Sequence, residues 1–293
     1  MKKHQLQMLS PIDGRYAEKC TAIRELFSEA SLIHYRIITE IRWLQFLARE
    51  REISHINPIP ETMNHAMEKI IDDFSLDDAI EVKKIESKIN HDVKAVEYFL
   101  QNKLSKIPGG SDYVSSIHFA CTSEDINNIS YAMMIRDTVL VIRSSLDEIG
   151  FKLRANSHQW CDAAMLSHTH GQPATPTTMG KEFANFLDRL EQQIGLLDKM
   201  EFKAKMNGAV GNFNAHRIAY PNADWPQISK TFIQNMGLKQ SVYTTQIEPH
   251  DWMAELLHCF IRINNILLDF SRDIWLYISF GYFKQVLNKD EVG

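Results

Sequence analysis

The residues best suited to chemistry lie close together, in residues 167–176. This segment contains two histidines, two threonines, a glutamine and two prolines. Imidazoles can exchange protons near neutral pH, and prolines restrict the backbone that carries them. A helical pattern begins at Thr177, and the free N–H groups at a helix start favour a nearby anion. The segment is therefore a candidate for proton transfer to an anionic substrate, on a rigid polar loop.

Other polar residues gather where we expect helices to begin or end. These segments are residues 90–92, 121–125, 207–214 and 246–251. The first N–H groups of a helix have no partner within the helix, so several helix starts that converge would hold a polyanion. The sequence therefore predicts a binding site assembled from segments that are far apart in the chain.

Each segment also has a purely structural interpretation. Asn90 and Asp92 are residue types that cap helices, and the same holds for Thr122 and Ser123. A single histidine such as His91 is more often a hydrogen-bonded polar residue than a catalyst. Residue types alone leave both interpretations open.

Two further possibilities concern metals and nucleotides. His168 and His170 could bind a metal ion, but no carboxylate or cysteine lies at ligand spacing, so we expect no metal site. The glycine-containing run at 207–214 matches neither a dinucleotide fingerprint nor a P-loop, and it could be only a linker.

The elements that must position these residues are helices. Residues 29–51 carry an apolar stripe at helical spacing, formed by Ile33, Ile37, Ile41, Leu44 and Leu47. Shorter helical patterns follow at 63–74, 85–89 and 93–104, and a Pro-Gly-Gly run at 108–110 ends the series. We expect residues 1–110 to form an N-terminal helical domain.

The remaining residues, 111–293, are expected to form a central domain of long helices. Proline is absent over three long stretches, and helices starting near residues 122, 177 and 249 fit them. Their broad apolar stripes indicate burial on several sides, as in a multi-subunit bundle. Sustained alternation is missing, so we predict an all-α fold, with residues 241–247 as the only strand candidate.

Composition narrows the class of protein. Apolar residues make up 44% and charged residues 24% of the 293, as in globular proteins. The net charge of −5 argues against a nucleic-acid or anionic-membrane binder. The four scattered cysteines favour buried, reduced thiols in a cytoplasmic protein. The sequence shows neither a secretory signal nor an apolar run of about 20 residues.

Six segments in order, spread over the whole chain, resemble the adenylosuccinate lyase family of the fumarase/aspartase superfamily, and its long bacterial form in particular. They read SPIDGRY at 10–16, NHDVKAVEY at 90–98, HFACTSEDINN at 118–128, THGQPATP at 169–176, NGAVG at 207–211 and QIEPHD at 246–251. Six ordered motifs are a specific signal, whereas each one alone is weak.

The resemblance implies an all-α, L-aspartase-like fold and an enzyme that eliminates fumarate from a C–N bond without a cofactor. The substrates would be adenylosuccinate, giving AMP, and the succinyl-carboxamide ribotide SAICAR, giving AICAR. It also implies a homotetramer whose long helices form a shared bundle, with each active site drawn from several subunits. The partners are therefore small molecules and further copies of the chain.

The resemblance also implies roles for particular residues. His170 matches the general acid that protonates the departing nitrogen, and His91 matches a histidine that orients the substrate. The other matched positions are substrate contacts: Arg15 and Tyr16 at the nucleotide, Asn90 and Asp92 beside His91, Thr122 and Ser123 at a succinyl carboxylate, and Gln246. Hydrogen-bond donors prepared for the charge that develops on that carboxylate would supply the largest catalytic effect.

Two departures from the family pattern stand out. His168 occupies a position where the family often has arginine or lysine. The sequence ends at residues 290–293, directly before the family's loop with the serine base, and the third, C-terminal helical domain is missing too. We therefore expect an N-terminal piece of the enzyme, which by itself lacks lyase activity.

Two alternatives remain. Another fumarate-releasing member of the superfamily, such as argininosuccinate lyase, aspartase or fumarase, would share the helices, but the segments at 90–94 and 246–251 favour the adenylosuccinate branch. A non-catalytic helical scaffold would use the polar segments only as caps. It predicts that AMP and fumarate leave the melting temperature unchanged.

Overall fold

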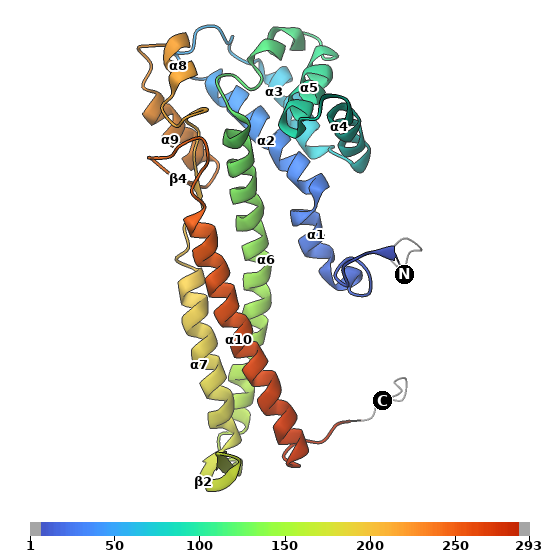
Figure 1. Cartoon of the computed structure of the whole chain (residues 1–293), viewed down its shortest axis with the longest axis vertical. Helices are drawn as coiled ribbons and strands as arrows, with labels where there is room; N and C mark the ends of the chain where they lie inside the picture. Colours follow the sequence, from blue (N-terminus) through green and yellow to red (C-terminus); the bar gives the residue numbers. More distant parts are fainter. Residues whose placement is uncertain (1–6, 287–293) are drawn as a thin grey trace. The chain divides into compact units, whose positions relative to one another are not determined.

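The structure is a computed structural model that describes residues 7–286. Within that range the chain forms two compact units (Figure 1). Unit 1 holds the residues up to 141 together with 201–250, and unit 2 holds 142–200 and the residues from 251 onward. The expected division at residue 110 stays a prediction.

Unit 1 is built mainly from short and medium helices. Its elements are η2 (Ala17–Cys20), α1 (Thr21–Phe27), α2 (Glu29–Leu47), α3 (Glu61–Asp72), α4 (Leu76–Ile89), α5 (Asp92–Ser105), η3 (Gly110–Asp112), η4 (Val114–Ser116), the first half of α6 (Ser123–Gln159), β3 (Lys203–Ala204), α8 (Asn214–Ala219), α9 (Trp225–Asn235) and β4 (Lys239–Gln240). Strands β3 and β4 form a short parallel pair.

Helix α2 lies at the centre of unit 1, where it packs against α3, α4 and α5 (Figure 1). Ser28 caps its start by accepting a hydrogen bond from the Ser31 N–H. The five apolar residues of its stripe are all buried, as the periodicity predicted. Trp43 is fully buried, and its indole N–H donates to the Phe119 carbonyl at 3.0 Å. The helix therefore anchors the loop that leads to α6.

Unit 2 consists of the second half of α6, the strands β1 (Ala164–Thr169) and β2 (Gln172–Thr178), and the helices α7 (Met179–Leu197) and α10 (Asp251–Ser279). The three long helices begin within two residues of the expected starts. Thr178 caps α7, and the buried face of α10 packs against α7. The predicted all-α architecture is thus confirmed in its helices.

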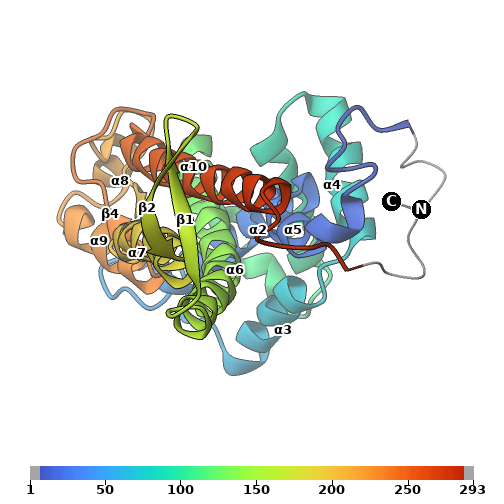
Figure 2. The same ribbon diagram turned by 90° about the horizontal axis from the view of Figure 1, so that it is seen from below.

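The sequence-based expectation was wrong for residues 167–176. They do not form a loop but the greater part of an antiparallel hairpin, and Figure 2 shows β1 and β2 side by side. The sequence does not predict strand β2, because it contains two prolines, Pro173 and Pro176. Proline lacks the N–H that a central strand needs, but a two-stranded hairpin has only edge strands and tolerates it.

The predicted strand at 241–247 is also wrong. The neighbouring strand β4 contains only Lys239 and Gln240, and the residues after it are irregular. Tyr243 is 93% exposed and Val242 is 61% exposed. Aromatic and β-branched residues favour a strand only where they pack on a buried face, and these two have none.

The four cysteines are free thiols, but the expectation that they are buried holds fully only for Cys259. Cys20 and Cys121 are partly exposed, and Cys161 is exposed. Across residues 7–286, no helix has the length and apolar character needed to cross a membrane.

A buried histidine in α8 gives unit 1 a pH-dependent stability. His216 is fully buried between the rings of Phe213 and Trp225, and burial is the main reason that its pKa falls to about 4. The unfolded chain binds a proton below about pH 6.5, whereas the folded chain does not until about pH 4. The contribution of His216 to the free energy of unfolding is therefore fully present above pH 6.5. It falls by about 3 kcal/mol as the pH falls toward 4.

Urea unfolding at pH 7 and pH 4.5 measures this effect. We expect His216→Phe to flatten the pH dependence, since phenylalanine fills a similar volume and binds no proton. The matched control is His65→Phe, at an exposed position on α3, which should leave the pH dependence of the unfolding free energy unchanged. An equal pH dependence in the wild type and His216→Phe would contradict the assignment.

Candidate active site

The start of α5 fixes the orientation of His91. Asn90 ends α4 in the left-handed conformation (φ 54°), and His91 follows as the N-cap of α5. The His91 Nδ1 accepts the Lys94 N–H at 3.2 Å, so the neutral ring carries its proton on Nε2. That Nε2 lies 3.4 Å from Ser123 Oγ. His91 can therefore donate a hydrogen bond beside the start of α6.

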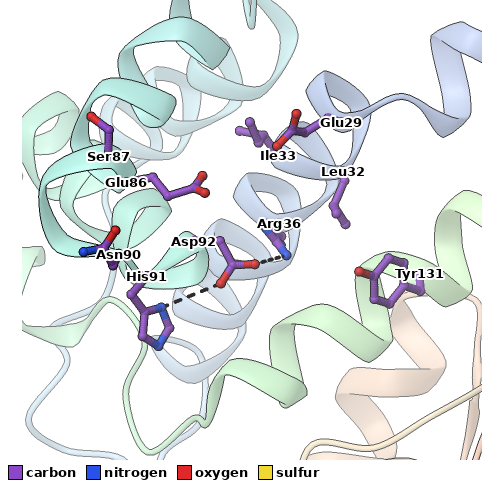
Figure 3. Close-up of a pocket in the computed structure, with 10 residues that line it drawn as sticks. All are labelled: Glu29, Leu32, Ile33, Arg36, Glu86, Ser87, Asn90, His91, Asp92 and Tyr131. Atoms are coloured by element: carbon purple, nitrogen blue, oxygen red, sulfur yellow. Dashed lines mark hydrogen bonds and ion pairs between the residues drawn. The ribbon is translucent and has the colours of Figure 1, made fainter. Parts of the chain in front are cut away.

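A pocket of about 580 Å³ adjoins His91 (Figure 3). Asn90, His91 and Asp92 line one side, and Arg36 and Tyr131 face them from α2 and α6. The full lining is Glu29, Leu32, Ile33, Arg36, Glu86, Ser87, Asn90, His91, Asp92 and Tyr131. Most of these side chains are polar, and the pocket has room for part of a nucleotide-sized substrate.

The start of α6 brings together two further predicted residues. The Gln246 amide donates to Thr122 Oγ1 at 3.5 Å, although the two residues are 124 positions apart. Thr122 is held in turn, because its N–H donates to Asp125 Oδ2 at 2.9 Å. The side chains of His91, Ser123, Thr122 and Gln246 thus lie around one helix N-terminus, and their role as substrate contacts stays a prediction.

A chain of ionisable groups lies next to Gln246. His250 lies between two carboxylates. Its Nδ1 is 3.1 Å from Glu248 Oε2, and its Nε2 is 3.5 Å from Glu124 Oε1. Burial raises the pKa of Glu124, although the neighbouring charge of His250 opposes the shift. Glu248 is itself buried and accepts a hydrogen bond from the Ser241 hydroxyl at 2.7 Å. This side of the site is therefore acidic and firmly anchored.

A fully buried ion pair lies beneath the α6 start. Lys205 Nζ is 3.0 Å from Asp125 Oδ1, and neither side chain is exposed to solvent. Asp125 also accepts the N–H groups of Asn207 and Gly208, and Lys205 donates to the Gly208 carbonyl. The pair therefore holds the Asn207–Gly208 segment against the α6 start.

Gly211 shows why this segment needs glycine. Its φ is 79°, and a Cβ placed there would meet the Thr244 carbonyl oxygen at 2.2 Å. Any side chain at position 211 would displace the irregular segment that contains Thr244 and leads to Gln246. The glycine run is thus a packing requirement of the site rather than a flexible linker.

His170 lies in unit 2, at the tip of the β1–β2 hairpin. His170 (φ 53°) and Gly171 (φ 71°) form the two-residue turn between the paired residues Thr169 and Gln172. Two positive φ values in succession are typical of the type I′ turn that joins tight hairpins. The turn presents the His170 imidazole at an exposed position.

Aromatic residues after α10 hold the hairpin. His168 stacks on Phe280, with ring centroids 4.8 Å apart, and the Tyr282 hydroxyl donates to the Leu166 carbonyl at 3.0 Å. His168 therefore packs against an aromatic ring in unit 2, whereas His170 two residues later extends to the tip of the turn.

Arg15 and Tyr16 are placed differently from the other predicted residues of unit 1. The Arg15 guanidinium lies 5.6 Å from the centre of the Tyr16 ring, both residues are exposed, and neither lines the pocket beside His91. The structure thus groups Asn90, His91, Asp92, Thr122, Ser123 and Gln246, and places Arg15 and Tyr16 outside that pocket.

Sequence reasoning missed Arg36 and Lys205, which support this group. The signal for Arg36 was present: it lies between Ile33 and Ile37 on the buried face of an otherwise apolar helix stripe. Lys205 gave no local signal, since its partner is 80 residues away. Over residues 7–286, His, Cys, Asp and Glu side chains form no group of three or more placed to hold a metal ion.

A comparison with family models places the chain. The model of a family described as Lyase matches residues 14–293. The chain belongs to the lyase family. The match covers nearly the whole length, including all the segments of the candidate site from Asn90 onward.

Curated relatives that resemble the chain include several adenylosuccinate lyases. Adenylosuccinate lyase of Legionella pneumophila (strain Philadelphia 1) is 47% identical over 289 residues, covering 98% of this chain and 63% of the relative. The enzymes of Vibrio cholerae (48% over 299 residues) and Escherichia coli K12 (46% over 298 residues) are covered over 65% and 64% of their lengths. The chain thus spans slightly less than two thirds of these relatives.

Two solved structures share the fold. A fumarate lyase from Mesorhizobium sp. BNC1 superposes with a TM-score of 0.70, and a β-carboxy-cis,cis-muconate cycloisomerase from Acinetobacter calcoaceticus sp. ADP1 with 0.72. Each match covers 87% of this chain and 57% of the other, at 18% identity. These likenesses concern the fold alone, and they support the predicted long-helix architecture.

Proposed function

We propose that the protein eliminates fumarate from adenylosuccinate, giving AMP, and from SAICAR, giving AICAR. The observation that carries the proposal is the identity of 46–48% to adenylosuccinate lyases over nearly the whole chain. The grouping of His91, Ser123 and Thr122 at one helix start supports it, because a helix N-terminus with hydroxyl and imidazole donors suits a succinyl carboxylate.

The proposed reaction begins when a base removes the proton from the β-carbon of the succinyl group. The resulting carbanion spreads its charge onto the adjacent carboxylate. The hydroxyls of Thr122 and Ser123 and the amide of Gln246 would donate to this carboxylate, where the charge develops. His91, which holds a proton on Nε2, would orient the same group.

In the second step the C–N bond breaks. The electron pair of the carbanion forms the double bond of fumarate, and the departing nitrogen takes the C–N electron pair together with a proton. We assign the donor of that proton to His170, because an imidazolium can donate near neutral pH. Asn90 and Asp92 would contact the substrate in the pocket, and Arg15 and Tyr16 would contact its nucleotide part.

Fumarate release by the protein as its gene encodes it tests the proposal. Adenylosuccinate and SAICAR should be turned over, whereas argininosuccinate, aspartate and malate should be turned over at least about 100-fold more slowly, because each would leave buried polar groups of the site unpaired. Preferred turnover of argininosuccinate, aspartate or malate would assign the protein to another branch of the superfamily.

The rival scaffold function is tested by binding. If the polar segments are only caps, AMP with fumarate should leave the melting temperature unchanged. If they form a site, ligand binding should raise it. Arg15→Ala and His170→Ala should then reduce the shift.

The proposal includes assembly into a homotetramer. On α10 the residues Ile261, Leu268 and Trp275 are 54%, 57% and 70% exposed and recur every seven positions. Such a stripe is typical of a helix that packs on a further helix, and the opposite face of α10 already covers α7. Another copy of the chain would bury this stripe.

Light scattering tests the assembly. Leu268→Glu should shift the protein toward smaller species, because a charge would be buried in the interface. Ile218→Glu is the matched control, since Ile218 is 86% exposed and lies on α8 in unit 1. A wild-type monomer, or equal masses for both variants, would contradict the proposed assembly.

A cytoplasmic location also belongs to the proposal, and the free thiols are compatible with it.

A further inference from the structure

One buried charge in unit 1 has a position that packing alone does not explain. Arg36 lies on the buried face of α2 between Ile33 and Ile37, and only 5% of the residue is exposed. Burying a guanidinium is costly unless it is paired and hydrogen-bonded. Its partners therefore indicate what the residue contributes.

Arg36 connects the starts of two other helices. Its Nη2 donates to Asp92 Oδ2 at 2.5 Å, and its Nε donates to Asn127 Oδ1 at 2.8 Å. Asp92 is the first residue of α5, and Asn127 lies in the second turn of α6. A guanidinium is a rigid, planar fork, so two bonds from one group fix the relative placement of both helix starts.

The same two helix starts carry His91 and Ser123. His91 directly precedes Asp92, and Ser123 lies one helical turn before Asn127. The direct contact between them, at 3.4 Å, is too long to hold this spacing alone. We propose that Arg36 is a positioning residue that sets the separation and the orientation of His91 and Ser123, and this inference rests on the proposed function for its kinetic test.

Arg36 also controls the surroundings of the His91 ring through Asp92. Burial tends to raise the pKa of Asp92, but the charge of Arg36 and hydrogen bonds from Arg36 and the helix start outweigh it, so the pKa is lowered. The carboxylate is held with Oδ1 at 3.7 Å from His91 Nδ1, beyond hydrogen-bond range (Figure 3). His91 Nδ1 therefore remains the acceptor of the Lys94 N–H, and Nε2 keeps the proton.

Removing the guanidinium should release Asp92. A free carboxylate can approach Nδ1 and accept a hydrogen bond from it, which favours the tautomer with the ring proton on Nδ1 instead of Nε2. Nitrogen-15 NMR of the histidine rings observes this change directly and requires no turnover. The tautomer of His91 is thus a readout that a purely structural role of Arg36 would leave unchanged.

The test compares Arg36→Gln, Arg36→Lys and Arg42→Gln. Arg42 is the matched control, because it lies on the same helix and pairs in the same way with Glu68 of α3, away from the pocket. Arg36→Gln should lower kcat by about 10- to 100-fold with KM changed less than about threefold, since misplacement of reacting groups by about 1 Å costs such factors. Arg36→Lys should recover kcat only in part, because one ammonium does not reproduce the fork.

The two readouts separate the possible failures. A shift of the His91 proton to Nδ1 together with a fall in kcat supports the proposal. Unchanged kcat, an unchanged tautomer, or a raised KM at constant kcat overturns it, and the last result would make Arg36 a direct ligand of the substrate. If Arg36→Gln does not fold, Asn127→Ala, which removes only the α6 connection, replaces it. A wild type that releases no fumarate refutes the proposed function and leaves the NMR test in place.

Discussion

Replacing His170 with asparagine is expected to lower the rate of fumarate release by about 100- to 10,000-fold, the usual contribution of a general acid. Without a proton donor, the nitrogen must leave with a negative charge. Asparagine suits the position, because His170 has a φ of 53° and asparagine tolerates the left-handed region better than alanine does. The substitution therefore removes the acid without straining the hairpin turn.

The matched control lies two residues earlier in the same hairpin. His168 stacks on Phe280, so His168→Gln should slightly weaken the anchoring of β1 and leave kcat within about threefold of the wild type. Steady-state kinetics with adenylosuccinate measures both variants, and circular dichroism confirms that each is folded. If His170→Asn kept more than about a tenth of the wild-type rate, the role of general acid would have to be assigned to another residue.

The hairpin shows where local sequence signals were insufficient. Residues 164–169 alternate only weakly, and β2 contains two prolines, which normally argue against a strand. The tight turn was recognisable only by its positive φ values at His170 and Gly171, because histidine before glycine is a weaker turn signal than asparagine before glycine. The long helices were predictable because their apolar periodicity persists over many turns.

The candidate site was predictable to the extent that motifs mark helix starts. Asn90 and His91 were recognised as a helix start, and the structure shows them as the residues that end α4 and cap α5. The contact between Thr122 and Gln246 was expected only as a convergence of segments, and the fold supplies its geometry. Capping and periodicity act over a few residues, so they predict the elements but not which of them meet.

The supporting residues depend on long-range packing. Arg36 reaches a partner 91 positions away in the chain, and Lys205 reaches one 80 positions away. A single sequence contains no signal that pairs such residues, although a charge on a buried helix face, as at Arg36, indicates that a partner must exist.

Replacing Lys205 with methionine is expected to destabilise unit 1 by about 3–5 kcal/mol, because it leaves the charge of Asp125 buried without its partner. Methionine has a similar length and no charge, so the cavity effect is small. Asp125 would still accept the N–H groups of Thr122 and Gly208, which limits but does not replace the loss. Urea unfolding measures the free energy, and the midpoint should fall while the slope stays constant.

The control uses the same substitution at the surface. Lys239 pairs with Glu201, but both side chains are half exposed and screened by solvent, so Lys239→Met should change the free energy of unfolding little. The double variant Asp125→Asn with Lys205→Met should recover part of the stability lost in Lys205→Met, because no unpaired charge remains. If Lys205→Met and Lys239→Met were equally stable, the buried pair would not be what holds the Asn207–Gly208 segment against the start of α6. The two hydrogen bonds between the Asn128 side-chain amide and the Lys205 backbone would then have to carry that role.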